Sequence, residues 1–89
     1  MRPKVSVAMA TYNGEKYIKE QIESILASIG KEDEIIISDD DSKDETIKII
    51  NNYMKNDNRI KLINGPKCGI IKNFENAIKN CKRKIYFFI

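Results

Sequence analysis

A short apolar run that leads into three aspartates constrains the fold of this chain more than any other feature. Residues Ile35–Ile37 are β-branched and predict a buried strand, and Asp39–Asp41 follow after a single serine. Ser42 and Glu45 then form a Ser-x-x-Glu pattern, which is typical of a helix start. A strand that passes directly into a helix is a unit of parallel α/β folds, in which ligands bind beyond the carboxyl ends of the strands. The pattern therefore predicts carboxylates at a ligand-binding edge.

The rest of the chain repeats this alternation. Apolar residues at helical spacing predict helices that begin after Asn13, near Ser42 and from Gly69, with Asn13 as a cap and Gly30 as a stop. Continuous apolar strands between one-sided helices indicate an α/β fold, with a Rossmann-like parallel sheet and helices on both faces. The predicted strands are Val5–Ala10, Glu34–Ser38, Ile60–Asn64 and Ile85–Ile89.

The composition narrows the possible functions. The 89 residues form one small domain or part of a larger one, and 16 Lys and Arg are scattered among 13 Asp and Glu, which argues against nucleic-acid binding. The absence of histidine excludes an imidazole base within the chain. Cys81 continues the apolar face of the third predicted helix and is expected to be a buried free thiol, which fits a reducing cytoplasm.

Two segments that follow predicted strands suggest a nucleotide site. Thr11 and Tyr12 follow the first strand and Asp39–Asp41 the second, so the two segments meet at one sheet edge if these strands are neighbours. An aromatic ring can stack on a nucleobase, which is worth about 1–3 kcal/mol per base. A carboxylate can accept a hydrogen bond from a base N–H. The alternative is a solvated turn in which one aspartate caps the second helix, and that explains one or two of the three carboxylates.

The motifs resemble a known family. Val5–Glu15 and Ser38–Thr46 resemble the two opening motifs of family 2 glycosyltransferases of the GT-A fold. Gly69–Ala77 followed by Ile85–Ile89 resembles the stretch before that family's acidic metal motif. The segment Gly14–Ile25 is similar to the bacterial branch that includes rhamnosyltransferase-like enzymes of surface polysaccharide synthesis.

The resemblance implies a nucleotide-diphosphate sugar as donor, usually uridine- or deoxythymidine-linked, and a saccharide or lipid-linked acceptor. It implies that Asp40 contacts the pyrimidine, while Asp39 and Asp41 shape the turn. Lys72 matches a basic position near the nucleotide, and a solvated charge on the third helix is an equal alternative for it. The residues that match the family's nucleotide site are Ala10, Thr11, Tyr12, Asn13, Glu15, Asp40 and Lys72.

The resemblance also implies parts that this sequence does not contain. The family's metal-binding Asp-x-Asp motif would begin just after Ile89, and its catalytic base would lie further along. We therefore expect residues 1–89 to be the N-terminal, nucleotide-sugar-binding portion of a truncated GT-A domain, without catalytic or metal-binding residues of its own. In the full-length parent, a divalent cation (Mg or Mn) would neutralise the leaving pyrophosphate, and transfer would invert the anomeric carbon. The parent is expected in the cytoplasm, with membrane association if its acceptor is lipid-linked.

Two functions from other classes remain open. One is a stand-alone nucleotide-binding module without catalysis. The other is an interaction domain that self-associates through the apolar segment Ile85–Ile89, because an exposed apolar edge strand invites pairing. An in-frame Asp-x-Asp after Ile89 would favour the transferase over both.

Overall fold

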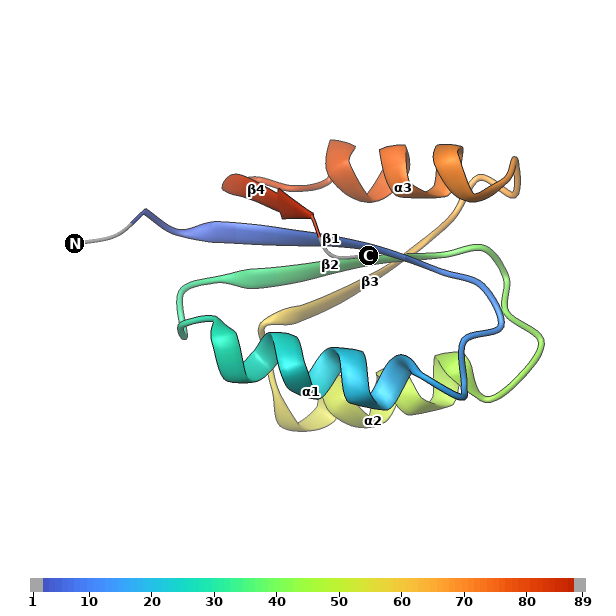
Figure 1. Ribbon diagram of the computed structural model, residues 1–89, viewed down its shortest axis with the longest axis horizontal. Coiled ribbons are helices and arrows are strands. Elements are labelled where there is room, and N and C mark those ends of the chain that lie inside the picture. The colour runs from blue at the N-terminus through green and yellow to red at the C-terminus, as the bar shows by residue number, and fades with distance from the viewer. Residues whose placement is uncertain (1–2, 88–89) are drawn as a thin grey trace.

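The part of the chain that the structure describes, residues 3–87 of a computed structural model, alternates strands and helices. Within it the strands form one parallel sheet in the order β3-β2-β1-β4 (Figure 1). The first two strands are therefore neighbours, which was the condition for their carboxyl ends to meet at one edge. In chain order the elements are β1 (Val5–Thr11), α1 (Ile18–Ser28), β2 (Glu34–Asp39), α2 (Thr46–Asn56), β3 (Ile60–Asn64), α3 (Ile70–Lys79) and β4 (Lys84–Phe87).

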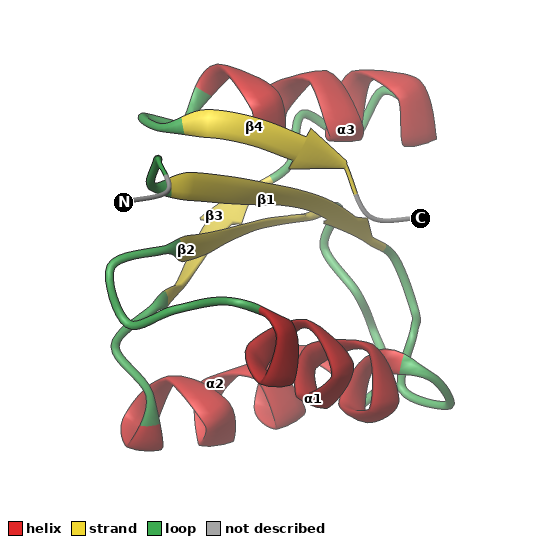
Figure 2. Cartoon of the chain, turned by 60° about the vertical axis from the view of Figure 1, so that its left-hand side comes forward, coloured by secondary structure: helices red, strands yellow, loops and turns green. Residues whose placement is uncertain are grey.

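Different helices cover the two faces of the sheet. Helices α1 and α2 lie on one face and α3 lies on the other (Figure 2). Val7 and Met9 of β1 point into the larger core, between the sheet and α1 and α2, whereas Ala8 points into the smaller core under α3. Successive residues of a strand face opposite sides, so a strand covered on both sides reads as a continuous apolar run. This arrangement confirms the predicted α/β fold with a Rossmann-like parallel sheet and helices on both faces.

The predicted strands agree closely with the structure. Strand β3 has the predicted bounds, and β1 and β2 each extend one residue further, to Thr11 and Asp39. Strand β4 begins at Lys84, and the predicted end at Ile89 lies outside the described residues. No helix within residues 3–87 combines the length and the hydropathy of a membrane span.

The first two helices begin later than predicted. Helix α1 begins at Ile18 rather than after Asn13, and α2 begins at Thr46 rather than near Ser42. The predicted Asn13 cap and the Ser42–Glu45 capping box are therefore wrong. Instead, Asn13 donates its backbone N–H to Ser42 Oγ at 2.8 Å, and its Oδ1 accepts the Lys43 N–H at 2.8 Å. These bonds take up the side-chain atoms that would cap a helix, and they join two loops to each other.

A partly buried ion pair joins Arg83, the residue before β4, to the first residue of β2 at the amino ends of the strands. Glu34 Oε1 lies 2.7 Å from Arg83 Nη1, and Glu34 Oε2 accepts a 2.6 Å hydrogen bond from Ser6 Oγ. Burial by itself raises the pKa of Glu34. Bonds from Ser6 Oγ and the Lys82 N–H, together with the charge of Arg83, outweigh burial and lower it. This cluster links strands at the end of the sheet away from Thr11 and Asp39, so it is a structural feature.

The two cysteines are unpaired. Cys81 packs against the smaller core and is half-buried, whereas Cys68 is exposed. The predicted free thiol at Cys81 is confirmed, although its burial is only partial, and α3 ends at Lys79, before this residue. Burial raises the pKa of the Cys81 thiol.

Candidate functional site

The carboxyl ends of three neighbouring strands meet at one edge of the sheet. Thr11 of β1 pairs in register with Asp39 of β2, which pairs with Asn64 of β3. The loops that follow these strands therefore emerge together, at the right of Figure 1. A pocket of about 510 Å³ lies among them, and it is lined by residues from all three loops and by the first turn of α3. This is the edge at which ligands bind in open parallel sheets.

Asp39 is buried and is a structural residue of this edge. One of its oxygens accepts hydrogen bonds from Thr11 Oγ1 at 2.7 Å and Ser42 Oγ at 2.6 Å. The other oxygen accepts the Ser42 N–H at 2.8 Å. Both oxygens are thus engaged with the protein, as expected for a carboxylate that shapes the turn.

Asp40 faces the pocket. Its N–H donates to the Thr11 carbonyl at 3.0 Å, and its Oδ1 accepts the Lys67 N–H at 2.9 Å. A Cβ at Gly65 would collide with Asp40 Oδ1 and Asn73 Oδ1, so glycine leaves the space that the carboxylate occupies. Among the described residues, Asp40 Oδ2 has no hydrogen-bond partner. Asp40 is therefore a fixed, half-buried carboxylate with one oxygen available to a ligand.

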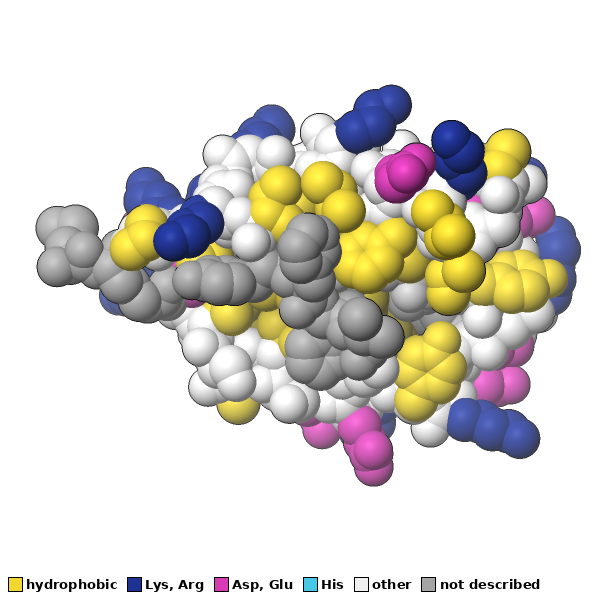
Figure 3. All heavy atoms as spheres, turned by 45° about the horizontal axis from the view of Figure 1, so that its top comes forward, with side chains coloured by type: hydrophobic (Ala, Val, Ile, Leu, Met, Phe, Trp, Pro, Cys, Tyr) yellow, Lys and Arg dark blue, Asp and Glu magenta, His cyan; other side chains and the backbone are white. Residues whose placement is uncertain are grey.

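Two tyrosines stand at the mouth of the pocket. Tyr12 is 58% exposed and Tyr17 is 42% exposed, and both line it. Ile70, at the start of α3, adds an exposed aliphatic side chain. The face that carries α3 shows gathered hydrophobic side chains (Figure 3). The pocket thus offers flat apolar surfaces next to the Asp40 carboxylate.

Asp41 links two lysines across the pocket mouth. Its Oδ2 lies 2.8 Å from Lys43 Nζ and 3.5 Å from Lys67 Nζ. The hydrogen bond from Lys43 and the charges of both lysines hold the pKa of Asp41 below its usual value. Asp41 has φ 64°, in the left-handed region, which fits its predicted role as a turn residue. Such exposed pairs contribute little to stability, because water screens them.

The pocket brings together only part of the predicted set. Four of the seven predicted residues line it: Ala10, Thr11, Tyr12 and Asp40. Asn13 and Glu15 instead hold the loop between β2 and α2. Asn13 Oδ1 accepts the Lys43 N–H at 2.8 Å, and the Glu15 N–H donates to Asp44 Oδ2 at 3.1 Å. Lys72 points to Glu75, with Nζ 3.7 Å from Oε1, and does not line the pocket. The nucleotide contacts of all seven stay predictions.

Sequence reasoning missed several residues that line the pocket. Tyr17 and Lys43 lie in loops that were predicted to be helical, and Lys67 lies in a turn with no motif. Asn73 carried a usable signal, because it is a polar residue on the apolar face of a helix, between Ile70 and Ala77. Buried polar groups are almost always hydrogen-bonded, so such a residue marks a specific contact.

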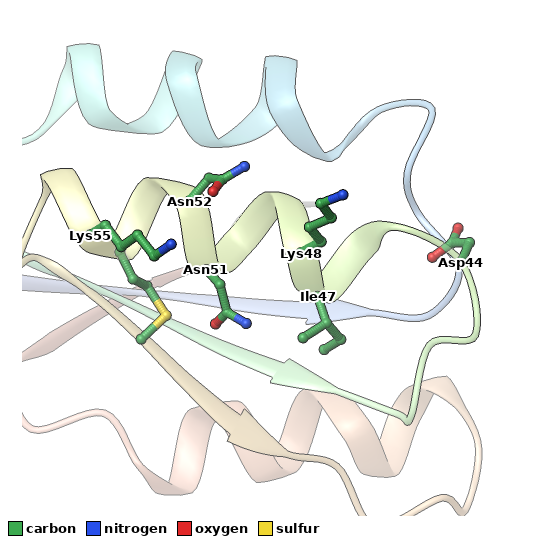
Figure 4. A pocket seen from close by; sticks show the side chains of 7 residues that line it. Asp44, Ile47, Lys48, Asn51, Asn52 and Lys55 are labelled. Carbon is green, nitrogen blue, oxygen red and sulfur yellow. The ribbon is translucent and has the colours of Figure 1, made fainter.

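A second hollow is a weaker candidate. It has a volume of about 750 Å³, and all its lining residues except Asp44 belong to α2 (Figure 4). Lys48 and Lys55 contribute charges along the helix. Because it is the surface of one helix, without an aromatic ring or a second loop, it offers no converging set of ligand contacts.

The described residues do not fit a metal centre. Within residues 3–87, no three or more Asp, Glu, Cys or His side chains cluster so that they could hold a metal ion. Both oxygens of Asp39 already accept hydrogen bonds from the protein, and Asp41 is held by two lysines.

The fold and the pocket define a Rossmann-like α/β domain with a ligand site at the carboxyl ends of its strands. A sequence model of Glycosyl transferase family 2 matches residues 6–89, so the chain belongs to that family. The predicted resemblance to family 2 and its GT-A fold is thereby confirmed.

This chain is also similar to named glycosyltransferases and to solved structures. A GalNAc(5)-diNAcBac-PP-undecaprenol beta-1,3-glucosyltransferase of Campylobacter jejuni is 42% identical over 59 residues, which is 66% of this chain and 19% of the relative. The crystal structure of S. aureus TarS 1-349 in complex with UDP has a TM-score of 0.79 at 32% identity, over 96% of this chain and 26% of TarS. A mannosyltransferase from Pyrobaculum calidifontis, in complex with GDP-Man and Mn²⁺, shares the fold with a TM-score of 0.81 at 20% identity, over 93% of this chain and 26% of its own. The chain thus spans about a fifth to a quarter of the length of these proteins.

Proposed function

We propose that residues 1–89 form the nucleotide-binding portion of a glycosyltransferase that uses a UDP- or dTDP-linked sugar as donor. The observation that carries this proposal is a pocket lined by both the exposed Tyr12 and Asp40, which has one oxygen available to a ligand. The TarS relative was crystallised with UDP, which supports a uridine-linked donor. The acceptor is proposed to be a saccharide or a lipid-linked saccharide of bacterial surface polysaccharide synthesis, since one relative is named for a PP-undecaprenol acceptor.

Each pocket residue has a proposed role in binding the nucleotide. Tyr12 stacks on the base, a contact worth about 1–3 kcal/mol. Asp40 Oδ2 accepts a base N–H, while Ala10 and Thr11 line the base and the ribose. Asn13 and Glu15 hold the loop that carries Tyr12. Lys72 remains a predicted nucleotide contact, and it would have to leave Glu75 to make one.

Binding and orientation of the donor nucleotide are the tasks of these residues in the reaction. The proposed parent inverts the anomeric carbon, works in the cytoplasm and uses a divalent cation, as the Mn²⁺ in the mannosyltransferase suggests. The described residues contain no cluster of three or more Asp, Glu, Cys or His side chains that could hold such an ion, so the cation's chemistry is not assigned to them.

The 89-residue chain is expected to bind nucleotide weakly and to transfer no sugar. Asp39 is buried and engaged at both oxygens, Asp41 is paired with lysines and Asp40 is assigned to the base, so none of these three carboxylates is available to deprotonate an acceptor. Release of UDP from UDP-sugars, measured with saccharide and lipid-linked acceptors, checks this. Turnover above the uncatalysed rate would contradict it.

Asp40→Ala is expected to weaken UDP binding at least tenfold, because it removes a charged acceptor for the base N–H. Isothermal titration with UDP and dTDP measures the loss. Glu20→Ala, an exposed carboxylate on α1, is the matched control and should bind like the wild type. Binding that is unchanged in Asp40→Ala would refute the assignment of Asp40.

A further inference from the structure

Lys67 contacts both Asp40 and Asp41 at the edge of the pocket. Its backbone N–H is bonded to Asp40 Oδ1 at 2.9 Å, and its Nζ lies 3.5 Å from Asp41 Oδ2. Its side chain is 66% exposed and lines the pocket. The backbone of Lys67 therefore holds the carboxylate that is proposed to read the base, while its ammonium group stands beside Asp41 in the same pocket.

The backbone of Lys67 adds a second observation. Its φ is 62°, in the left-handed region, where a residue with a side chain is disfavoured by about 1–2 kcal/mol relative to the right-handed one. Glycine adopts this conformation without that penalty. Strained residues at a binding edge suggest a functional reason for the side chain, and here the side chain is a cation that faces a pocket.

The chemistry of nucleotides tells which part of the ligand Lys67 would meet. In a uracil or thymine nucleotide the base N–H lies between two carbonyls, and the N–H and one of these carbonyls lie on the edge of the ring away from the sugar. A base whose N–H faces Asp40 therefore presents a carbonyl to the groups that flank Asp40, while the ribose and phosphates extend away. Lys67 is one of these groups, because its backbone N–H donates a hydrogen bond to Asp40 Oδ1 and the residue lines the same pocket.

We propose that Lys67 is a specificity-determining residue, which donates a hydrogen bond to the base carbonyl next to the N–H that Asp40 accepts. This inference rests on the proposed nucleotide function. The pair recognises an N–H adjacent to a C=O, an arrangement that uracil, thymine and guanine present and that cytosine and adenine lack. Asp41 holds the ammonium groups of Lys43 and Lys67 at the pocket mouth until the base arrives.

The test is a set of ¹H–¹⁵N NMR titrations of the 89-residue chain with UDP, CDP and uridine, which lacks phosphates. The wild type is expected to bind UDP at least tenfold more tightly than CDP. Lys67→Met should lose about tenfold in affinity for both UDP and uridine, and should leave CDP affinity nearly unchanged. Lys67→Arg, which keeps a donor, should retain most of the preference for UDP over CDP.

Lys67→Gly separates binding from folding. It should lose the same affinity as Lys67→Met without a lower melting temperature, because glycine suits φ 62°. Lys79→Met, an exposed lysine in the last turn of α3, is the matched control and should bind UDP like the wild type.

The outcomes distinguish this inference from the function on which it rests. If Asp40→Ala loses binding while Lys67→Met binds UDP and uridine like the wild type, the role of Lys67 is refuted. If Lys67→Met weakens UDP but not uridine, the ammonium acts on phosphate and the inference is again refuted. If Asp40→Ala binds UDP normally, or the wild type binds no nucleotide, the proposed function itself fails.

Discussion

Asp39→Ala is expected to lower the free energy of unfolding by about 3 kcal/mol and to abolish nucleotide binding, although Asp39 is not proposed to touch the nucleotide. The buried carboxylate accepts three hydrogen bonds, from Thr11 Oγ1 and from the N–H and Oγ of Ser42. Alanine leaves these donors without their acceptor and releases the loop that carries Asp40. Urea denaturation followed by circular dichroism measures the first effect, and titration with UDP the second.

Asp40→Ala is the matched comparison, one residue further along the same loop. Asp40 is half-buried and its side chain accepts one hydrogen bond, from the Lys67 N–H, so the free energy of unfolding should change by less than about 1 kcal/mol. Its nucleotide binding should nevertheless be lost. Asp39→Ala is thus expected to lose more free energy of unfolding than Asp40→Ala, although both lose nucleotide binding. A larger loss of stability in Asp40→Ala would contradict the roles given to both residues.

The architecture could be predicted because the strands and helices carry local patterns. In β1, Val7 and Ala8 face opposite cores, and a strand buried on both sides leaves a continuous apolar run that is visible in the sequence. Its register follows from the same burial, since a shift by one residue would exchange the two faces. The positions of the strands and the fold class could therefore be predicted from local sequence patterns, without knowledge of contacts between distant residues.

The loops could be predicted only in part, because their polar residues bond to partners about 30 residues away. Ser42 has the local pattern of a helix cap, yet its hydroxyl accepts the Asn13 N–H and donates to Asp39. A sequence pattern does not tell whether a serine serves its own helix or another loop, because both use the same oxygen. Lys67 had no signal at all, since a left-handed lysine is recognised only from the backbone.

These loop bonds converge on the Thr11 carbonyl, which accepts hydrogen bonds from the Asp40 N–H at 3.0 Å and from Asn73 Nδ2 at 3.1 Å. Asn73 Oδ1 in turn accepts a 2.6 Å bond from Ser38 Oγ. The side-chain amide of Asn73, a residue that is 1% exposed, thus joins α3 to the ends of β1 and β2. Asn73 therefore supports the position of Asp40 from beneath the pocket.

Asn73→Asp is expected to lower the free energy of unfolding by about 3 kcal/mol at neutral pH and to weaken UDP binding. The change keeps the shape of the side chain and the acceptor for Ser38, but it replaces the donor to the Thr11 carbonyl with a buried negative oxygen. Urea denaturation of the variant and the wild type gives the difference in stability. Asn52→Asp, an exposed site in the middle of α2, is the matched control and should stay within about 0.5 kcal/mol of the wild type.

The pH dependence of this deficit identifies its cause. Burial raises the pKa of the introduced carboxyl above its unfolded value of about 3.9. As the pH falls through that raised pKa, the carboxyl takes up a proton and can donate to the Thr11 carbonyl as the amide of Asn73 does. The stability difference from wild type should therefore shrink between neutral pH and about pH 4. A deficit that stays constant over this range would mean that the loss comes from packing and not from the missing donor.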